Sequence, residues 1–298
     1  MLITRNHGLV EEVIDALRSR GFKVGYVEYP TYERRSLDIV ARRSNEKYIM
    51  KVSFEIDCVS SKELAELAAL SKIFDAAGIV VSKKTRKKEL KDYVVYERYN
   101  VPAMTPETLR ELVDRGEVYV YAGRGGYYVR INGKKLRKKR EEKEMSLGDL
   151  AQLLGVSRKA VYEYERKRMN LSFSTALRLI EIFGEDILLP VNIRGRDIRE
   201  RGELIELQKL KTKFKEIVSQ LKELGFLTAV TERTPIDIAA RRNDKGKFAI
   251  TLKETGRSQR DLEAKLEAAE IVSRTLNIRS LIIEDLKNLV RYISEFYG

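Results

Sequence analysis

The sequence predicts a multidomain α+β protein in which a central all-α bundle lies between two α/β domains. Near the middle of the chain, at residues 146–165, two short amphipathic helices are expected on either side of a glycine-containing turn. The order helix, strand, aspartate-bearing strand, strand, helix and strand can be read once before this stretch and once after it. The length of 298 residues is too great for one small bundle and predicts two or three domains.

Residues 1–116 are expected to form the first α/β domain. Val10, Val13, Ile14 and Leu17 have the spacing of one helix face, and an Arg-Gly pair ends that helix. Short apolar or alternating runs separated by polar turns predict the strands. The expected strands are 22–29, 37–41, 48–52, 77–82 and 94–95, and further helices are expected at 64–74 and from Pro106.

A β-hairpin is expected next, as a connector over residues 117–132. The run VYVYAGRGGYYVRI, from Val118 to Ile131, alternates on both sides of a glycine-rich turn at 123–126. Glycine supplies the positive φ angles that tight hairpin turns require.

The central bundle is expected over residues 133–190. Ser146 stands at an N-cap position with Asp149 three residues later, which is close to a capping box. Gly155 supplies the positive φ that ends the first helix, and Ser157 caps the second. The residues expected to face the core are Leu147, Leu150, Ala151, Leu154, Ala160, Val161 and Tyr164. An αα-corner in an ordinary helical bundle is the alternative.

The pattern S-L-x-x-L-A-x-x-L-G-V-S-x-x-x-V-x-x-Y-E resembles the helix-turn-helix of the lambda-repressor-like (Xre/Cro) family. The resemblance implies four or five helices over about 133–183, with the second helix of the motif in the DNA major groove. Leu147 stands where many members have a phosphate-binding Gln, and Glu163 where many have a base-reading or basic residue. The flanking helices would be 135–143 and one that begins at Ser172, with Ala176, Leu177, Ile180 and Phe183 as its core face.

A basic excess accompanies this motif. The formal net charge is +13, the pI is near 9.6, and residues 117–200 hold 18 basic and 12 acidic side chains. Seven of the ten residues from Lys134 to Lys143 are basic. Such a run is often only a solvated helix face, but as the first helix of a DNA-binding bundle it favours phosphate contacts.

The candidate DNA-contacting residues come from both observations. They belong to the motif's two helix starts, to the outward face of the recognition helix and to the basic run. They are Ser146, Ser157, Arg158, Lys159, Tyr162, Lys134, Lys135, Arg137 and Lys138. The partner expected is double-stranded DNA, and because two half-sites are usual, a homodimer is expected as well.

The second α/β domain is expected over residues 203–298. It begins with apolar residues spaced 3-4-3-4-3, from Leu207 through Leu210 to Leu224. This seam allows a short dimeric coiled coil, but it is shorter than three heptads. We therefore favour a helix that packs on its own domain.

The two flanking domains look like copies of one another. Leu221 to Phe226 echoes Leu17 to Phe22, and the stretch around Asp237 echoes the stretch around Asp38. A strand, an apolar helix and a last strand follow in both copies. A repeat of this length indicates duplicated domains rather than a solenoid.

This order of elements resembles the restriction-endonuclease-like fold, and within it the archaeal Holliday junction resolvases. That family carries Asp on one strand and Glu-x-Lys on the next, which together hold a divalent metal and position water. Asp38 and Asp237 match the Asp, but the triplets read Lys51-Val-Ser and Thr251-Leu-Lys. We therefore expect both copies to be degenerate, without metal or catalytic residues. We do not expect the nearby Glu55 or Glu254 to replace the missing carboxylate.

Other classes of site and location are disfavoured by composition. One cysteine, Cys58, and one histidine exclude a His/Cys zinc site and predict a reducing compartment. No apolar run approaches the roughly 20 residues of a membrane span. We expect a cytoplasmic, nucleoid-associated protein that needs no cofactor and contacts no membrane.

The layout as a whole resembles a family of archaeal helix-turn-helix regulators. The leading hypothesis is a sequence-specific DNA-binding transcriptional regulator with no enzymatic activity and a recognition helix at about Ser157–Arg166. One alternative is a metal-dependent, structure-specific nuclease or junction resolvase. The other is a chromatin-type protein that binds DNA without sequence preference.

Overall fold

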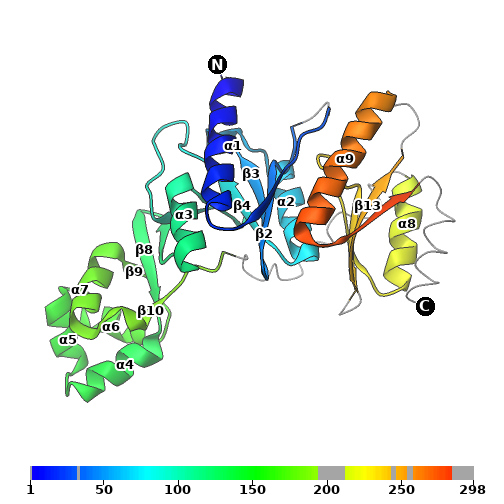
Figure 1. The fold of residues 1–298 in the computed structure, drawn as a ribbon. Helices are drawn as coiled ribbons and strands as arrows, with labels where there is room; N and C mark the ends of the chain where they lie inside the picture. Colours follow the sequence, from blue (N-terminus) through cyan, green and yellow to red (C-terminus); the bar gives the residue numbers. More distant parts are fainter. Residues whose placement is uncertain (1, 32–33, 194–211, 243–245, 254–257, 284–298) are drawn as a thin grey trace. The chain divides into compact units, whose positions relative to one another are not determined.

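A computed structural model of the chain describes residues 2–31, 34–193, 212–242, 246–253 and 258–283 (Figure 1). The chain divides into two compact units. The first comprises Met1–Glu89, Arg98–Pro106 and Ile193–Gly298, and the second comprises Leu90–Glu97 and Glu107–Asn192. Within the described residues, no helix is long and apolar enough to cross a bilayer.

The first half of the first unit is a five-stranded sheet in the order β1-β2-β3-β4-β6. Strands β1 to β3 are antiparallel, whereas β4 runs parallel to both β3 and β6. All five residues of β4 are buried, as expected of a parallel strand inside a sheet. The elements are α1 (Leu2–Arg18), β1 (Lys23–Tyr26), β2 (Ile39–Arg43), β3 (Glu46–Val52), α2 (Ser61–Phe74), β4 (Ala77–Val81) and β6 (Val101–Met104).

The second half of this unit has the same order of elements. Strands β11, β12 and β13 are antiparallel and β14 runs parallel to β13, which is the pairing of β1 to β4. Its elements are α8 (Thr212–Glu223), β11 (Leu227–Val230), β12 (Ile238–Arg242), β13 (Gly246–Leu252), α9 (Gln259–Leu276) and β14 (Arg279–Ile283). Of the predicted heptad seam, Leu207 and Leu210 lie outside the described residues.

Helices α2 and α9 are built alike. A serine caps each N-terminus, and an αL residue ends each helix, Asp75 after α2 and Asn277 after α9. In the last turns, the hydroxyl of Ser71 donates to Leu67 O and that of Ser273 donates to Ala269 O. The similarity of caps and turns gives a register for comparing the two halves residue by residue.

Each of these helices packs on its own sheet and on the sheet of the other half (Figure 1). Helix α2 lies against β11 and β12, and α9 lies against β1 and β2. The close approach of α9 depends on Gly25, where a Cβ would come within 2.6 Å of Ile271 Cγ2. The two halves are therefore joined reciprocally, in the manner of a two-fold dimer.

A buried ion-pair network reinforces this contact. The carboxylate of Glu66, on α2, accepts hydrogen bonds from Ser36 Oγ at 2.7 Å and from Arg233 N at 3.1 Å. It also lies 3.4 Å from the Arg233 guanidinium, and all three residues are buried. A buried carboxylate is stable only when it is paired and hydrogen-bonded in this way.

The second unit combines a small sheet with a helical bundle. Strand β5 is parallel to β7, and β8 pairs antiparallel with β7, β9 and β10. The bundle, predicted to be all-α, therefore includes two short strands, which are too short to show a periodicity in the sequence. The elements are β5 (Val94–Arg98), α3 (Pro106–Arg115), β7 (Val120–Gly123), β8 (Gly126–Ile131), α4 (Gly133–Glu142), α5 (Leu147–Leu154), α6 (Arg158–Glu165), β9 (Leu171–Ser172), α7 (Phe173–Phe183) and β10 (Leu188–Leu189).

The core of the bundle draws on the hairpin as well as the helices. Val129 and Ile131 of β8 pack in one cluster with Leu136, Leu150 and Val161. The prediction that Leu177 faces this core is wrong, because it is 46% exposed. The buried stripe of α7 consists of Ala176, Leu179 and Phe183, and this spacing places Leu177 outside it.

We expect Glu66→Ala to lower the free energy of unfolding of the first unit by roughly 3–5 kcal/mol, because it leaves the buried Arg233 without its carboxylate. Urea denaturation followed by circular dichroism would measure the loss. Glu270→Ala, at an exposed position on α9, is the matched control and should change stability by less than about 0.5 kcal/mol. Equal losses for the two variants would contradict the role given to Glu66.

Candidate nucleic-acid interface

The caps predicted for the central motif are present. Ser146 Oγ accepts hydrogen bonds from Gly148 N at 3.2 Å and Asp149 N at 3.1 Å, and the Asp149 carboxylate accepts one from Ser146 N at 2.8 Å. Hydrogen bonding to its carboxylate by the Ser146 side chain, and then by the Ser146 backbone N–H, lowers the pKa of Asp149. Gly155 ends α5 at a φ of +65°, and the hydroxyl of Ser157 caps α6 by accepting from Ala160 N. The local sequence thus fixes both ends of the turn.

Helix α6 is held in place by contacts at its C-terminal end. Arg140, from α4, donates to Glu165 at 2.7 Å and to Met145 O at 2.7 Å, and both side chains of the ion pair are buried. The first residue of α4 must be glycine, because a Cβ on Gly133 would lie 2.3 Å from Glu165 O. One arginine of the basic run therefore orients the recognition helix.

The outward face of α6 carries basic side chains that have no acidic partner among the described residues. Arg158 and Lys159 are exposed and make no ion pair with the described residues. Tyr162 is 39% exposed, and the Arg166 guanidinium lies 4.5 Å from the centre of its ring. Arg158, Tyr162 and Arg166 are four residues apart and so share one face of the helix.

The candidate residues predicted from the sequence did not include the basic residues at the end of this helix. Arg166, Lys167 and Arg168 are all exposed and follow directly on the recognition face. The only signal in the sequence was three adjacent basic residues, which a loop also commonly carries. The structure adds Arg166 to the predicted set, because its guanidinium stacks on the ring of Tyr162.

The basic run of α4 is largely engaged within the bundle. Lys135 and Lys139 bind the Asp186 carboxylate at 2.7 and 2.5 Å, and their hydrogen bonds lower its pKa to about 2. Arg137 pairs with Glu141 at 2.8 Å and Lys138 with Glu142 at 3.6 Å, one helical turn away. Lys134, the remaining candidate, is exposed and has no ion-pair partner in the described part of the chain.

These pairs differ in how readily they can exchange for a phosphate. The Arg137 and Lys138 pairs are exposed, so water and salt screen them and they contribute little to stability. Lys135 and Lys139 also donate to the carbonyls of Asp186 and Phe183, which fixes them against the segment after α7. Lys134, Arg137 and Lys138 are therefore better placed to contact phosphates than Lys135.

The nuclease-like positions lie in the first unit. Asp38 is buried and accepts a hydrogen bond from Val52 N at 2.8 Å. Lys51, the residue in place of the triplet's Glu, sends its ammonium to within 3.2 Å of Asp38 and 3.6 Å of Glu63. Glu63 comes from α2, and a sequence comparison limited to the strands could not have found it.

The second half also pairs its aspartate with a lysine, but the lysine comes from a different element. Asp237 accepts from Leu252 N at 2.7 Å, and Lys265, 2% exposed, donates to both carboxylate oxygens at 2.7 and 2.8 Å. Lys265 lies twelve residues before the αL cap of α9, as Glu63 does before that of α2. The cation thus comes from β3 in one half and from α9 in the other.

These side chains do not fit a divalent metal. Each retained aspartate already binds a lysine ammonium and a backbone N–H, and Glu55 turns to Arg86 at 3.4 Å and Lys84 at 3.9 Å. The described residues contain no group of three or more His, Cys, Asp or Glu side chains able to hold a metal ion. Glu254 lies outside the described residues. Mg²⁺ sites need several oxygen ligands, and the aspartate of each half is already bound to a lysine.

Two known protein families match the chain, each over one part of it. Residues 6–118 match the PD-(D/E)XK superfamily domain, and residues 136–189 match a helix-turn-helix domain. Together they cover the first half of the first unit and the helical bundle. No solved structure matches the chain.

Similar proteins extend over nearly the whole chain. A protein of Methanothermobacter thermautotrophicus is 35% identical over 95% of this chain and 86% of its own length. A protein of Methanocaldococcus jannaschii is 35% identical over 94% and 86%, and one of Sulfurisphaera tokodaii is 32% identical over 97% and 95%. All three carry the name "Putative HTH-type transcriptional regulatory protein". The chain belongs to this HTH-type family.

In this HTH-type protein, the Asp186 carboxylate pairs with Lys135 and Lys139 of α4. We expect Asp186→Asn to increase the affinity for random duplex DNA several-fold and to steepen its dependence on salt, because Lys135 and Lys139 become available to phosphates. Fluorescence anisotropy over a salt series would measure both. Glu267→Gln, an exposed position on α9 with the same change of charge, is the control. An affinity unchanged or reduced in Asp186→Asn would contradict this assignment.

Proposed function

We propose that this protein is a sequence-specific, double-stranded DNA-binding transcriptional regulator. The observation that supports it best is the face of α6, where Arg158, Lys159 and Arg166 surround Tyr162 without an acidic partner in the described residues. Cations that a protein leaves unpaired on a helix-turn-helix are available to base edges and phosphates. The names of the relatives are consistent with this role.

In this proposal α6 lies in the major groove. Arg158 and Lys159, in its first turn, reach guanine edges or phosphates, and Tyr162 contacts a thymine methyl group or a phosphate. The stacked Arg166 restricts the Tyr162 ring before DNA arrives. Ser146 and Ser157 hold the helix starts at the backbone, and Lys134, Arg137 and Lys138 bind phosphates beside the groove.

The proposed organisation places this bundle, residues 133–190, between two nuclease-like domains. Residues 1–116 and 203–298 form those domains, and 117–132 connect the first to the bundle. With an ammonium against each retained aspartate, both domains are inert as nucleases in this proposal. In this proposal the two domains pack against each other, and the bundle alone recognises DNA. The protein acts in the cytoplasm.

A homodimer is part of the proposal, because one recognition helix reads only half of a typical operator. The bundle exposes apolar side chains that a partner copy could cover. Phe173 and Leu177, four residues apart on α7, are 44% and 46% exposed, and Leu153 on α5 is 53% exposed. Exposed apolar groups of this size on a small bundle are typical of interaction surfaces.

Selection from random duplex DNA tests the proposal. The wild-type protein should enrich one motif, and Arg158→Ala with Lys159→Ala should abolish the preference by removing roughly 1–3 kcal/mol of discrimination per base contact. Lys62→Ala with Arg260→Ala, two exposed positions in the first unit, removes the same charges and should leave the motif unchanged. A wild-type protein that enriches no motif and binds all duplexes alike would instead be the chromatin-type protein.

The PD-(D/E)XK match makes a nuclease the second candidate, and cleavage assays separate the two. We expect branched and linear DNA to remain intact after incubation with the full chain and Mg²⁺ or Mn²⁺, because Lys51 and Lys265 occupy the carboxylates that a metal would need. Gel electrophoresis against a catalytic resolvase would measure this. Cleavage that disappears in Asp38→Asn or Asp237→Asn would establish the nuclease instead.

A further inference from the structure

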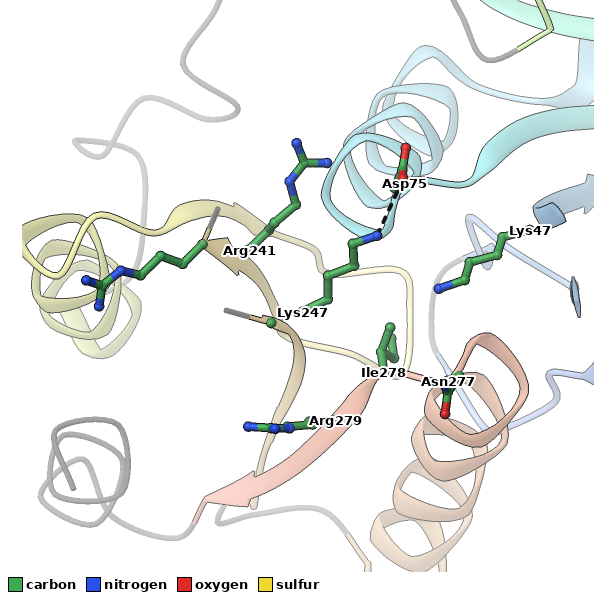
Figure 2. Close-up of a pocket in the computed structure, with 9 residues that line it drawn as sticks. Lys47, Asp75, Arg241, Lys247, Asn277, Ile278 and Arg279 are labelled. Atoms are coloured by element: carbon green, nitrogen blue, oxygen red, sulfur yellow. Dashed lines mark ion pairs between the residues drawn. The ribbon is translucent and has the colours of Figure 1, made fainter. Parts of the chain in front are cut away.

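A cationic hollow of about 700 Å³ lies in the first unit, where the two halves meet (Figure 2). It is at the opposite end of β3 and β13 from the retained aspartates. Of the nine described residues that line it, five are basic and one is acidic. The lining residues are Lys47, Asp75, Arg241, Arg242, Gly246, Lys247, Asn277, Ile278 and Arg279.

Basic residues occupy equivalent positions of the two halves at or beside the hollow, although Arg42 is not among its lining residues. Lys47 and Lys247 are the second residues of β3 and β13, and Figure 2 shows their ammonium groups directed toward the same space. Arg42 and Arg241, the fourth residues of β2 and β12, donate to helix carbonyls of the opposite half. Arg42 Nε lies 3.1 Å from Thr275 O, and Arg241 Nη1 lies 3.2 Å from Lys72 O.

Some of this charge is used to join the halves. The C-terminal carbonyls of a helix carry partial negative charge and need donors, which Arg42 and Arg241 supply. Lys247 likewise donates to Phe74 O at 3.1 Å and lies 3.6 Å from the Asp75 carboxylate. Lys47 makes no hydrogen bond or ion pair with the described residues, so joining the halves does not account for it.

The gathered cations raise one another's electrostatic energy. Burial lowers the pKa of Lys47, and the positive charges of Lys247 and Arg42 lower it further, while Asp75 opposes them only in part. Like charges held close together disfavour one another's charged forms, and a nearby opposite charge offsets this effect. An anion in the hollow would relieve this repulsion and would touch both halves.

We propose that this hollow binds a small ligand that carries several phosphate groups. Five basic side chains against one carboxylate match a polyphosphate chain better than a single carboxylate or phosphate. The arginine guanidinium groups suit phosphate because they can donate two parallel hydrogen bonds. The volume is within the range of pockets that take nucleotide-sized molecules.

Isothermal titration calorimetry on the full chain tests the proposal at constant ionic strength. The probes are ATP, inorganic tripolyphosphate and inorganic phosphate. We expect tripolyphosphate or ATP to bind at least tenfold more tightly than phosphate and to raise the melting temperature as its concentration increases. Equal binding of ATP and tripolyphosphate assigns recognition to the phosphates alone, whereas tighter binding of ATP adds a contribution from the nucleoside. Either result supports the proposal.

Charge-removing variants place the ligand. Lys47→Gln removes a side chain that makes no hydrogen bond or ion pair with the described residues, and it should weaken binding about tenfold. Adding Lys247→Gln should weaken it further. Lys62→Gln is the control, because it removes an exposed charge at the opposite end of α2 and should leave binding unchanged. Melting temperature without ligand shows whether each variant is folded.

Three outcomes would overturn the proposal. The first is no binding of ATP or tripolyphosphate at millimolar concentration. The second is binding that Lys47→Gln and Lys62→Gln weaken equally, which would reflect only the net charge. The third is a duplex DNA that displaces tripolyphosphate and loses affinity in Lys47→Gln, which would make the hollow a DNA-backbone site.

Discussion

The first unit depends on the packing of α2 and α9, each against two sheets at once. Neither helix can leave the other half's strands without exposing buried surface, and Gly25 is small because α9 lies directly over it. The buried Glu66 carboxylate and the capping of helix carbonyls by Arg42 and Arg241 give the contact its polar specificity. The two halves, which share one order of elements, therefore form one compact unit, because each half completes the surroundings of the other half's helix.

This packing gives the two ends of the central strands different chemistry. At one end, each retained aspartate is neutralised by a lysine, Lys51 from β3 or Lys265 from α9. In each half a lysine therefore pairs with the aspartate, although the two lysines come from different elements. At the other end, basic residues of both copies gather around a single hollow. Charge that a metal would supply in an active nuclease is supplied here by the chain itself.

In the second unit, some basic residues are paired with an acidic residue, and others have no such partner among the described residues. Glu165 pairs with the buried Arg140, and this pair orients α6. Asp186 binds Lys135 and Lys139 near the end of α7. The cations of α6 are left without such partners among the described residues. The electrostatic surface of the bundle is therefore set less by how many basic residues it has than by where its few carboxylates lie.

Local signals in the sequence determined the helix-turn-helix, its caps and the repeated order of elements. Caps, a positive-φ glycine and apolar spacing act over a few residues, so the amino-acid order alone was enough to place Ser146, Gly155 and Ser157. The tertiary structure decided which charges are free and which are paired, because the partners of Asp186, Glu63 and Lys265 are a dozen or more residues away in the chain. The reciprocal packing of the halves and the hollow lined by cations of both halves were also visible only in the tertiary structure. Neither contact produces a periodic pattern in the amino-acid sequence.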